Sequence, residues 1–245
     1  MSVFLYIKKN TFLHRLDPRT KILMLAVLFL TAALIADIVW LLALLACMAA
    51  LFIAAKSLGN IARMGVLFMM IAAATFVLWA LFYRISGANA YAYAAAMSIR
   101  FVDLLCAGLL YLSITSLEEV SAGLMLLGVP YPIAFALSLS FRLVIVFIDT
   151  GFTIVEAQKV RGNNAAEGSL VKRIKAYAPL LVPLILTGIK KAETLTAALE
   201  SKGFSPKNKI DMRERYGMKA ADWIVAVACA ALAGAVTVMK VKGMI

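Results

Sequence analysis

The sequence has little of what most enzymes and metal-binding proteins use at their sites. Only 16% of its 245 residues are charged, it contains one histidine, and its three cysteines are far apart without a CxxC pair. A site of several histidines is therefore excluded, and neither a zinc site nor a disulfide framework is indicated. The sequence also has no GxxxxGK(S/T) phosphate loop, no GxGxxG after a strand and no HExxH helix, so we expect no catalysis by this chain itself.

Long apolar runs dominate what is present. Apolar residues make up 64% of the chain, and the mean hydropathy is +0.93. A helix needs about 20 apolar residues to cross a hydrocarbon core roughly 30 Å thick, and several runs reach that length. We therefore predict an all-α, polytopic membrane protein with about five transmembrane helices and a cytoplasmic platform of amphipathic helices. The predicted spans are 22–37, 38–55, 64–83, 93–115 and 222–239.

The basic residues are unevenly distributed and indicate which parts face the cytoplasm. Of the 25 lysines and arginines, 13 lie between Glu156 and Lys219, where there are only six acids. Because loops rich in Lys and Arg stay on the cytoplasmic side, we assign this segment and the basic amino terminus to the cytoplasm. The net charge of +12 is then a feature of topology, and no nucleic acid is expected as a partner.

The region after the fourth span changes in character. Acids follow Ser116 in the pattern of a helix start, and Gly128 with Pro130 marks the end of this amphipathic helix. The next helical pattern is apolar as far as Phe147 and then increasingly polar, so we expect it to leave the membrane; a further crossing around residue 133 or 180 is the alternative. We divide the chain into an amino-terminal membrane domain with about four spans, a set of cytoplasmic helices and a final transmembrane helix, at 1–115, 116–219 and 220–245.

Four ionisable residues lie within or beside predicted spans. Arg100 and Asp103 are one helical turn apart, so they share a face and are expected to neutralise each other in part. Arg142 and Asp149 also share a face, and we expect a structural pairing there. The alternative is an ion or proton path, which would make the chain a self-sufficient secondary transporter. A membrane-embedded enzyme has less support, because the sequence gathers no cluster of His, Cys or acids.

The amino-terminal lead has its own local signals. His14 is expected to have a surface role. Asp17 is expected to cap the first helix with Pro18 at its first position, and Arg19 and Lys21 are expected to meet lipid phosphate.

Two segments repeat one helix-end pattern of alanine, three residues, a cation and glycine. An alanine and a cation four residues apart lie on one helical face, and glycine readily takes the left-handed conformation that ends a helix. Ordinary capping explains one such pattern, whereas two basic helix tips can dock in two equivalent acidic clefts of a dimeric partner. The two copies are Ala157, Arg161 and Gly162, and Ala198, Lys202 and Gly203.

Together these features resemble the transmembrane coupling subunit of energy-coupling factor transporters. These transporters are a branch of the ATP-binding-cassette importers and take up vitamins or transition-metal ions. The similarity lies in the lead at 14–21, the run at 127–130, Arg142 and the two helix ends, and it spans nearly the whole chain. The middle segment, 116–219, would then consist of coupling helices.

The resemblance implies a function for the helix ends. Such subunits carry two Ala-Arg-Gly tripeptides whose arginines insert into grooves of two cytoplasmic ATPases. Arg161 and Gly162 match the first, with Val160 in place of its alanine. The second is looser, because Ser201, Lys202 and Gly203 keep its charge and glycine but lack its arginine. Lysine cannot make the planar bidentate contact of a guanidinium with a carboxylate.

The resemblance also implies the partners and the location. The chain would be a multi-pass protein of a prokaryotic plasma membrane with a cytoplasmic amino terminus. Its partners would be two cytoplasmic ABC ATPases, a small substrate-binding membrane subunit and the lipid bilayer. It would be non-catalytic and bind no cofactor or metal itself, because the partner subunits hold the ATP and Mg.

Overall fold

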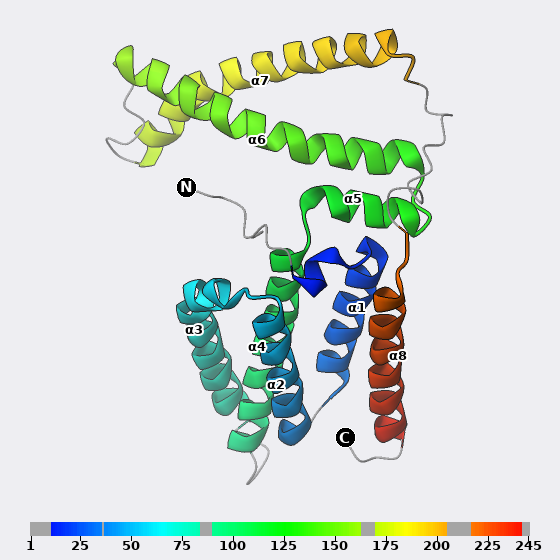
Figure 1. Ribbon diagram of the computed structural model, residues 1–245. Coiled ribbons are helices and arrows are strands. Elements are labelled where there is room, and N and C mark those ends of the chain that lie inside the picture. Colours follow the sequence, from blue (N-terminus) through cyan, green and yellow to red (C-terminus); the bar gives the residue numbers. More distant parts are fainter. Residues whose placement is uncertain (1–10, 36, 84–89, 163–169, 205–216, 242–245) are drawn as a thin grey trace. The chain divides into compact units, whose positions relative to one another are not determined.

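The computed structural model describes residues 11–35, 37–83, 90–162, 170–204 and 217–241. Within these ranges all regular structure is helical, which confirms the all-α class (Figure 1). The chain divides into two compact units, one made of Met1–Leu127 with Met212–Ile245 and the other of Gly128–Asp211. The helices are η1 (Phe12–Arg15), α1 (Pro18–Leu34), α2 (Ile38–Ala54), α3 (Leu58–Tyr83), α4 (Ala90–Ile114), α5 (Leu117–Leu126), α6 (Tyr131–Val160), α7 (Leu170–Ser201) and α8 (Ala220–Val241).

The first unit is a helix bundle with α5 lying across one end (Figure 1). Helix α4 packs on α1, α2 and α3, and α1 also packs on α8 and α5. Buried apolar side chains of α1, α2 and α4 stabilise these contacts. Among the most buried are Leu28, Leu41, Met48, Phe52 and Leu110, none of which is more than 4% exposed.

Local capping explains where two helices of this unit begin. Asp17 accepts a hydrogen bond from the backbone N–H of Arg19 at 2.9 Å, and Pro18 takes the first position of α1. At α5, the backbone N–H of Glu119 donates to Ser116 Oγ at 3.3 Å, and that of Ser116 donates to Glu119 Oε2 at 3.0 Å. This capping box and the Asp17 cap confirm the predicted starts of both helices.

Four described helices are long and apolar enough to cross a membrane, with the qualifying segments at Met64–Phe82, Tyr91–Ile114, Tyr131–Val160 and Ala220–Lys240. Those in α3, α4 and α8 coincide with predicted spans, and together the segments support a polytopic membrane protein. The set differs from the prediction in two respects. Helix α6 qualifies because it is apolar over most of its length, and α1 and α2, with 17 residues each, are just short of the usual ~20.

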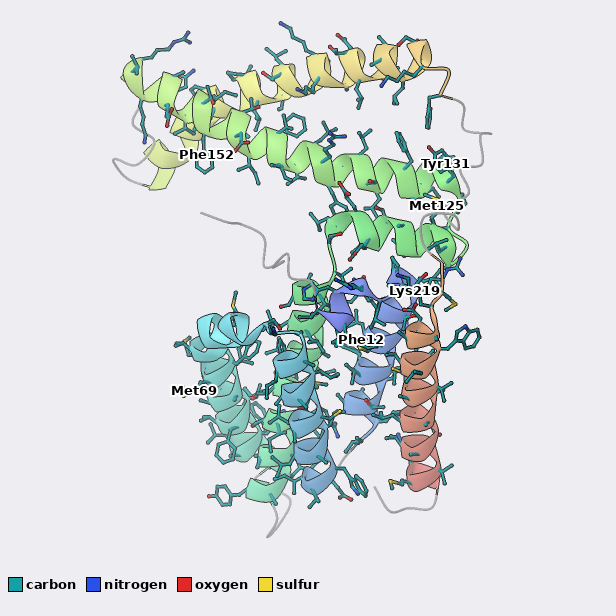
Figure 2. The ribbon with its side chains drawn as sticks, in the orientation of Figure 1. Phe12, Met69, Met125, Tyr131, Phe152 and Lys219 are labelled. Atoms are coloured by element: carbon teal, nitrogen blue, oxygen red, sulfur yellow. The ribbon has the colours of Figure 1, made fainter. Side chains whose placement is uncertain are left out.

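Helix α3 presents a largely apolar outer surface. Met69 points away from the bundle (Figure 2) and is 69% exposed, and Phe82 is 74% exposed. Side chains of this kind are stable on a surface that hydrocarbon covers, as expected for a transmembrane helix.

The second unit is an antiparallel pair formed by α6 and α7 (Figure 1). Phe204, which follows α7, stacks on Phe135 near the start of α6 with ring centroids 4.7 Å apart. Further along, Gly188 of α7 lies against Phe147 of α6, whose ring is 3.5 Å from the position of an added Cβ. The end of α7 therefore lies beside the start of α6.

Gly123 brings α5 against α1 and leaves no room for a side chain. An added Cβ would come within 2.7 Å of Ile22 Cδ1 and 3.1 Å of Pro18 Cβ. We expect Gly123→Leu to lower the free energy of unfolding by about 1–3 kcal/mol, measured as a lower midpoint of thermal unfolding in detergent. The control is Gly108→Leu on α4, where nothing lies within 4 Å of an added Cβ. Equal midpoints for the two variants would contradict the prediction.

Candidate functional site

Helix α6 ends in the predicted pattern. The backbone N–H of Arg161 donates to Ala157 O at 3.3 Å, and that of Gly162 donates to Lys159 O at 2.9 Å. Gly162 has a φ of +83°, in the left-handed region that residues with a Cβ rarely adopt. Arg161 is therefore the cap residue, and Val160 beside it is 90% exposed.

Helix α7 ends in the same way. The backbone N–H of Lys202 donates to Ala198 O at 3.3 Å, and that of Gly203, with a φ of +69°, donates to Glu200 O at 2.9 Å. A third bond of 2.9 Å runs from the N–H of Phe204 to the carbonyl five residues earlier and completes a Schellman motif.

The two helix ends are therefore geometrically equivalent. In each, an exposed cation is the cap residue and the next residue is a left-handed glycine, which confirms the predicted conformation. Ser201 is exposed, as Val160 is. The function of these residues remains a prediction at this point.

The two cations lie at opposite ends of the α6–α7 pair. Lys202 is close in sequence to Phe204, which stacks at the start of α6, whereas Arg161 follows the end of α6. Helix α6 has 30 residues, so at 1.5 Å per residue it is about 45 Å long. The unit thus carries two separate basic tips rather than one basic patch.

The structure does not join Arg100 to Asp103. The Arg100 guanidinium donates to Ile35 O at the end of α1 and to Met97 Sδ. Asp103 is fully buried, and neither of its carboxylate oxygens has a hydrogen-bond partner within the described ranges. The predicted neutralisation is therefore wrong, because the long guanidinium reaches a helix-end carbonyl that lacks an intrahelical partner.

Arg142 and Asp149 are not paired either. Both are exposed on α6, and the part of the chain that the structure describes has no ion pair between them. Seven residues correspond to about 10 Å along a helix, which is too far for direct contact. No group of three His, Cys, Asp or Glu that could hold a metal ion occurs among the described residues.

A buried lysine of α1 is bonded to three other segments of the first unit. Lys21 has no exposed surface, and its ammonium donates to His14 O at 2.9 Å, Ile114 O at 3.0 Å and Glu119 Oε2 at 2.9 Å. Its predicted contact with lipid phosphate is therefore wrong, as is the surface position of His14, which is 8% exposed. Lys21 precedes the apolar part of α1. Burial lowers the pKa of its ammonium, whereas the neighbouring Glu119 carboxylate raises that pKa.

Asp222 at the start of α8 extends this network. Its carboxylate oxygens accept from the backbone N–H groups of Asp17 and Lys219, each at 2.7 Å, and Asp222 is 1% exposed. Phe12 and Lys219 mark this end of the unit in Figure 2. The starts of α1, α5 and α8 therefore meet in one buried network. We call Asp17, Lys21, Glu119 and Asp222 the polar cluster.

Removing Asp222 should destabilise the first unit. Asp222→Ala leaves the backbone N–H groups of Asp17 and Lys219 without this acceptor, and a hydrogen bond to a charged group contributes about 1.5–3 kcal/mol. We expect the free energy of unfolding to fall by about 2–4 kcal/mol, seen in thermal unfolding in detergent. Asp37→Ala is the matched control, because Asp37 precedes α2, is exposed and makes no side-chain capping bond. The prediction fails if both variants unfold at the same temperature.

Comparison with known proteins identifies relatives over most of this chain. The model of the family described as "CbiQ: Cobalt transport protein" matches residues 9–212. A relative from Streptococcus equi subsp. equi, named energy-coupling factor transporter transmembrane protein EcfT, is 29% identical over 231 residues, covering 86% of this chain and 85% of the relative. An EcfT from Streptococcus thermophilus is 30% identical over 226 residues, covering 81% and 83%. A shorter match, to EcfT of Bacillus selenitireducens, is 43% identical over 75 residues, covering 31% and 28%.

The family match includes both helix ends and three members of the polar cluster, and it stops before Asp222. Its extent agrees with the helices described above, from η1 to the end of α7. The chain belongs to the CbiQ cobalt transport protein family and is a transmembrane component of the energy-coupling factor type.

Proposed function

We propose that this chain couples two cytoplasmic ATPases to a small substrate-binding membrane subunit. Arg161 and Lys202 dock in acidic grooves of the two ATPases, and ATP-driven movement of the ATPases moves α6 and α7. The movement passes to the substrate-binding subunit, which releases a vitamin or transition-metal ion into the cell. The chain itself is non-catalytic, and the partner subunits hold the ATP and Mg.

The observation that carries this proposal is the equivalence of the two helix ends. Two similar ATPases present two similar surfaces, and each then needs the same kind of contact. In both ends the cation is exposed and its backbone is fixed by the cap, so docking immobilises little more than one side chain. The two contacts differ in one respect, since Arg161 can bind a carboxylate in bidentate fashion and Lys202 acts as a point charge.

The contacts between α6 and α7 favour a position of this pair at the membrane surface over a crossing by α6. Lys190 and Lys191 of α7 line the same cavity as Leu143, in the apolar part of α6. If α6 crossed the bilayer, these lysines would lie within it beside the apolar half of α6. Each charge near the bilayer centre costs about 2.5–3.5 kcal/mol or more. A cytoplasmic platform avoids that cost and agrees with a cytoplasmic amino terminus.

One face of α7 has the chemistry of an interface with a membrane subunit. Leu181, Ile185 and Ile189 recur every four residues, and each is more than half exposed, at 54%, 59% and 52%. Val182 and Leu186 widen the face and are 58% and 54% exposed. An apolar stripe of this size indicates a binding partner, and we assign it to the small substrate-binding subunit.

Charge reversal at both tips tests the proposal. In Arg161→Glu/Lys202→Glu we expect the ATPases that co-purify from gently solubilised membranes to fall at least about tenfold, because each tip then repels an acidic groove. The amount of the chain in the membrane should not change. Arg142→Glu/Lys190→Glu is the matched control, with the same change of charge at exposed positions of the same two helices.

Two results would refute the proposal. One is full retention of the ATPases by the variant with both tips reversed. The other is accessibility labelling that finds either tip on the outer side of the bilayer.

A further inference from the structure

The polar cluster joins helices that are far apart in the sequence. Lys21 donates to Glu119 across 98 positions, and the backbone of Asp17 donates to Asp222 across 205. Lys21 also bonds the carbonyl of Ile114, the last residue of α4. The side chains of Lys21 and Glu119 are 0% and 19% exposed, and Asp17 and Asp222 are buried, so water competes little for these bonds.

Both chain connections between the two units run from elements that this cluster holds. The first unit ends at Leu127, directly after α5, and resumes at Met212, ahead of α8. Glu119 fixes the start of α5, and Asp222 fixes the start of α8 through the backbone of Lys219. The second unit is therefore tethered at both of its ends to helices whose starts are locked.

The support for α5 extends along the helix and then stops. Ser121, Ala122 and Gly123 are buried, and Gly123 lies against Pro18 in the first turn of α1. The chain after α5 turns at Gly128, whose φ is +107°. The contact with α1 thus covers the helix but not the turn that follows it.

We propose that Lys21 and Glu119 are positioning residues for coupling, which hold α5 fixed on α1 so that movement of α6 and α7 begins after Leu127. This inference rests on the proposed function. The two residues act through α5. With α5 fixed, the moving pair works against a stationary base in the membrane unit, whereas a loose α5 would absorb part of the movement.

The chemistry of the ion pair suits this task. Sliding α5 along α1 would withdraw Glu119 from a buried ammonium that also serves two carbonyl groups, and would leave charge buried without a partner. Apolar contacts are non-directional and tolerate a small slide at little cost. The ion pair therefore holds α5 at one position along α1.

Hydrogen–deuterium exchange of the purified complex, with and without a non-hydrolysable ATP analogue, tests the inference. In the wild type we expect the analogue to change exchange within 128–204 and to leave 117–127 unchanged. Lys21→Met/Glu119→Gln removes both charges and leaves neither one buried alone. In this variant we expect the ATPases still to co-purify and the analogue to accelerate exchange in α5 at least about tenfold.

Controls separate positioning from simple stabilisation. Met48→Ala opens a cavity in the core of the same unit, and it should raise exchange equally with and without the analogue. If the double variant fails to fold, Glu119→Gln alone carries the same test, because glutamine preserves the capping box.

Two outcomes overturn the inference, and they are distinguishable. Exchange in α5 that stays independent of the analogue in the variant would mean that Lys21 and Glu119 only stabilise the fold, with the proposed function intact. A wild-type complex without ATPases would remove the proposed function and this inference together.

Discussion

A buried ammonium group needs acceptors for its protons, and in this chain that requirement determines where four helices meet. The acceptors of Lys21, itself in α1, come from His14 in η1, from the last residue of α4 and from Glu119 in the first turn of α5. Satisfying one side chain therefore fixes the end of α4 and the start of α5 relative to α1. Glu119 Oε2 accepts both the bond from Lys21 and the bond from the backbone of Ser116 in the capping box. The same oxygen atom therefore fixes the start of α5 and attaches α5 to α1.

The sequence predicted well those features whose causes are local. The caps of α1 and α5 and the left-handed glycines that end α6 and α7 depend on residues within five positions of one another, and each of them is observed. The polar cluster depends on partners 98 and 205 positions apart. In a single sequence, a lysine before an apolar run looks the same whether it meets lipid phosphate or a buried carboxylate. Its assignment therefore needed the tertiary structure.

The error at α4 has a physical cause as well, and the apolar character of α6 needs its neighbour to be interpreted. The spacing of Arg100 and Asp103 permits a pair, but a guanidinium can also reach a neighbouring helix, where Ile35 offers a carbonyl at the end of α1. For α6, hydropathy measures the helix alone, whereas the charged residues of α7 that pack beside it decide which environment the pair can tolerate. The candidate tips were identified because their pattern occurs twice, and the residues that hold α5 left no repeated pattern in the sequence.

The aromatic stack at the end of α7 has a mechanical consequence. Phe204 follows Lys202 directly after the glycine and is stacked on Phe135, so a force applied to the second tip bears on the beginning of α6. The other end of that same helix carries Arg161. If Arg161 and Lys202 dock as proposed, the two docking sites are therefore connected through α6, and force is transmitted between them over about 45 Å of continuous helix.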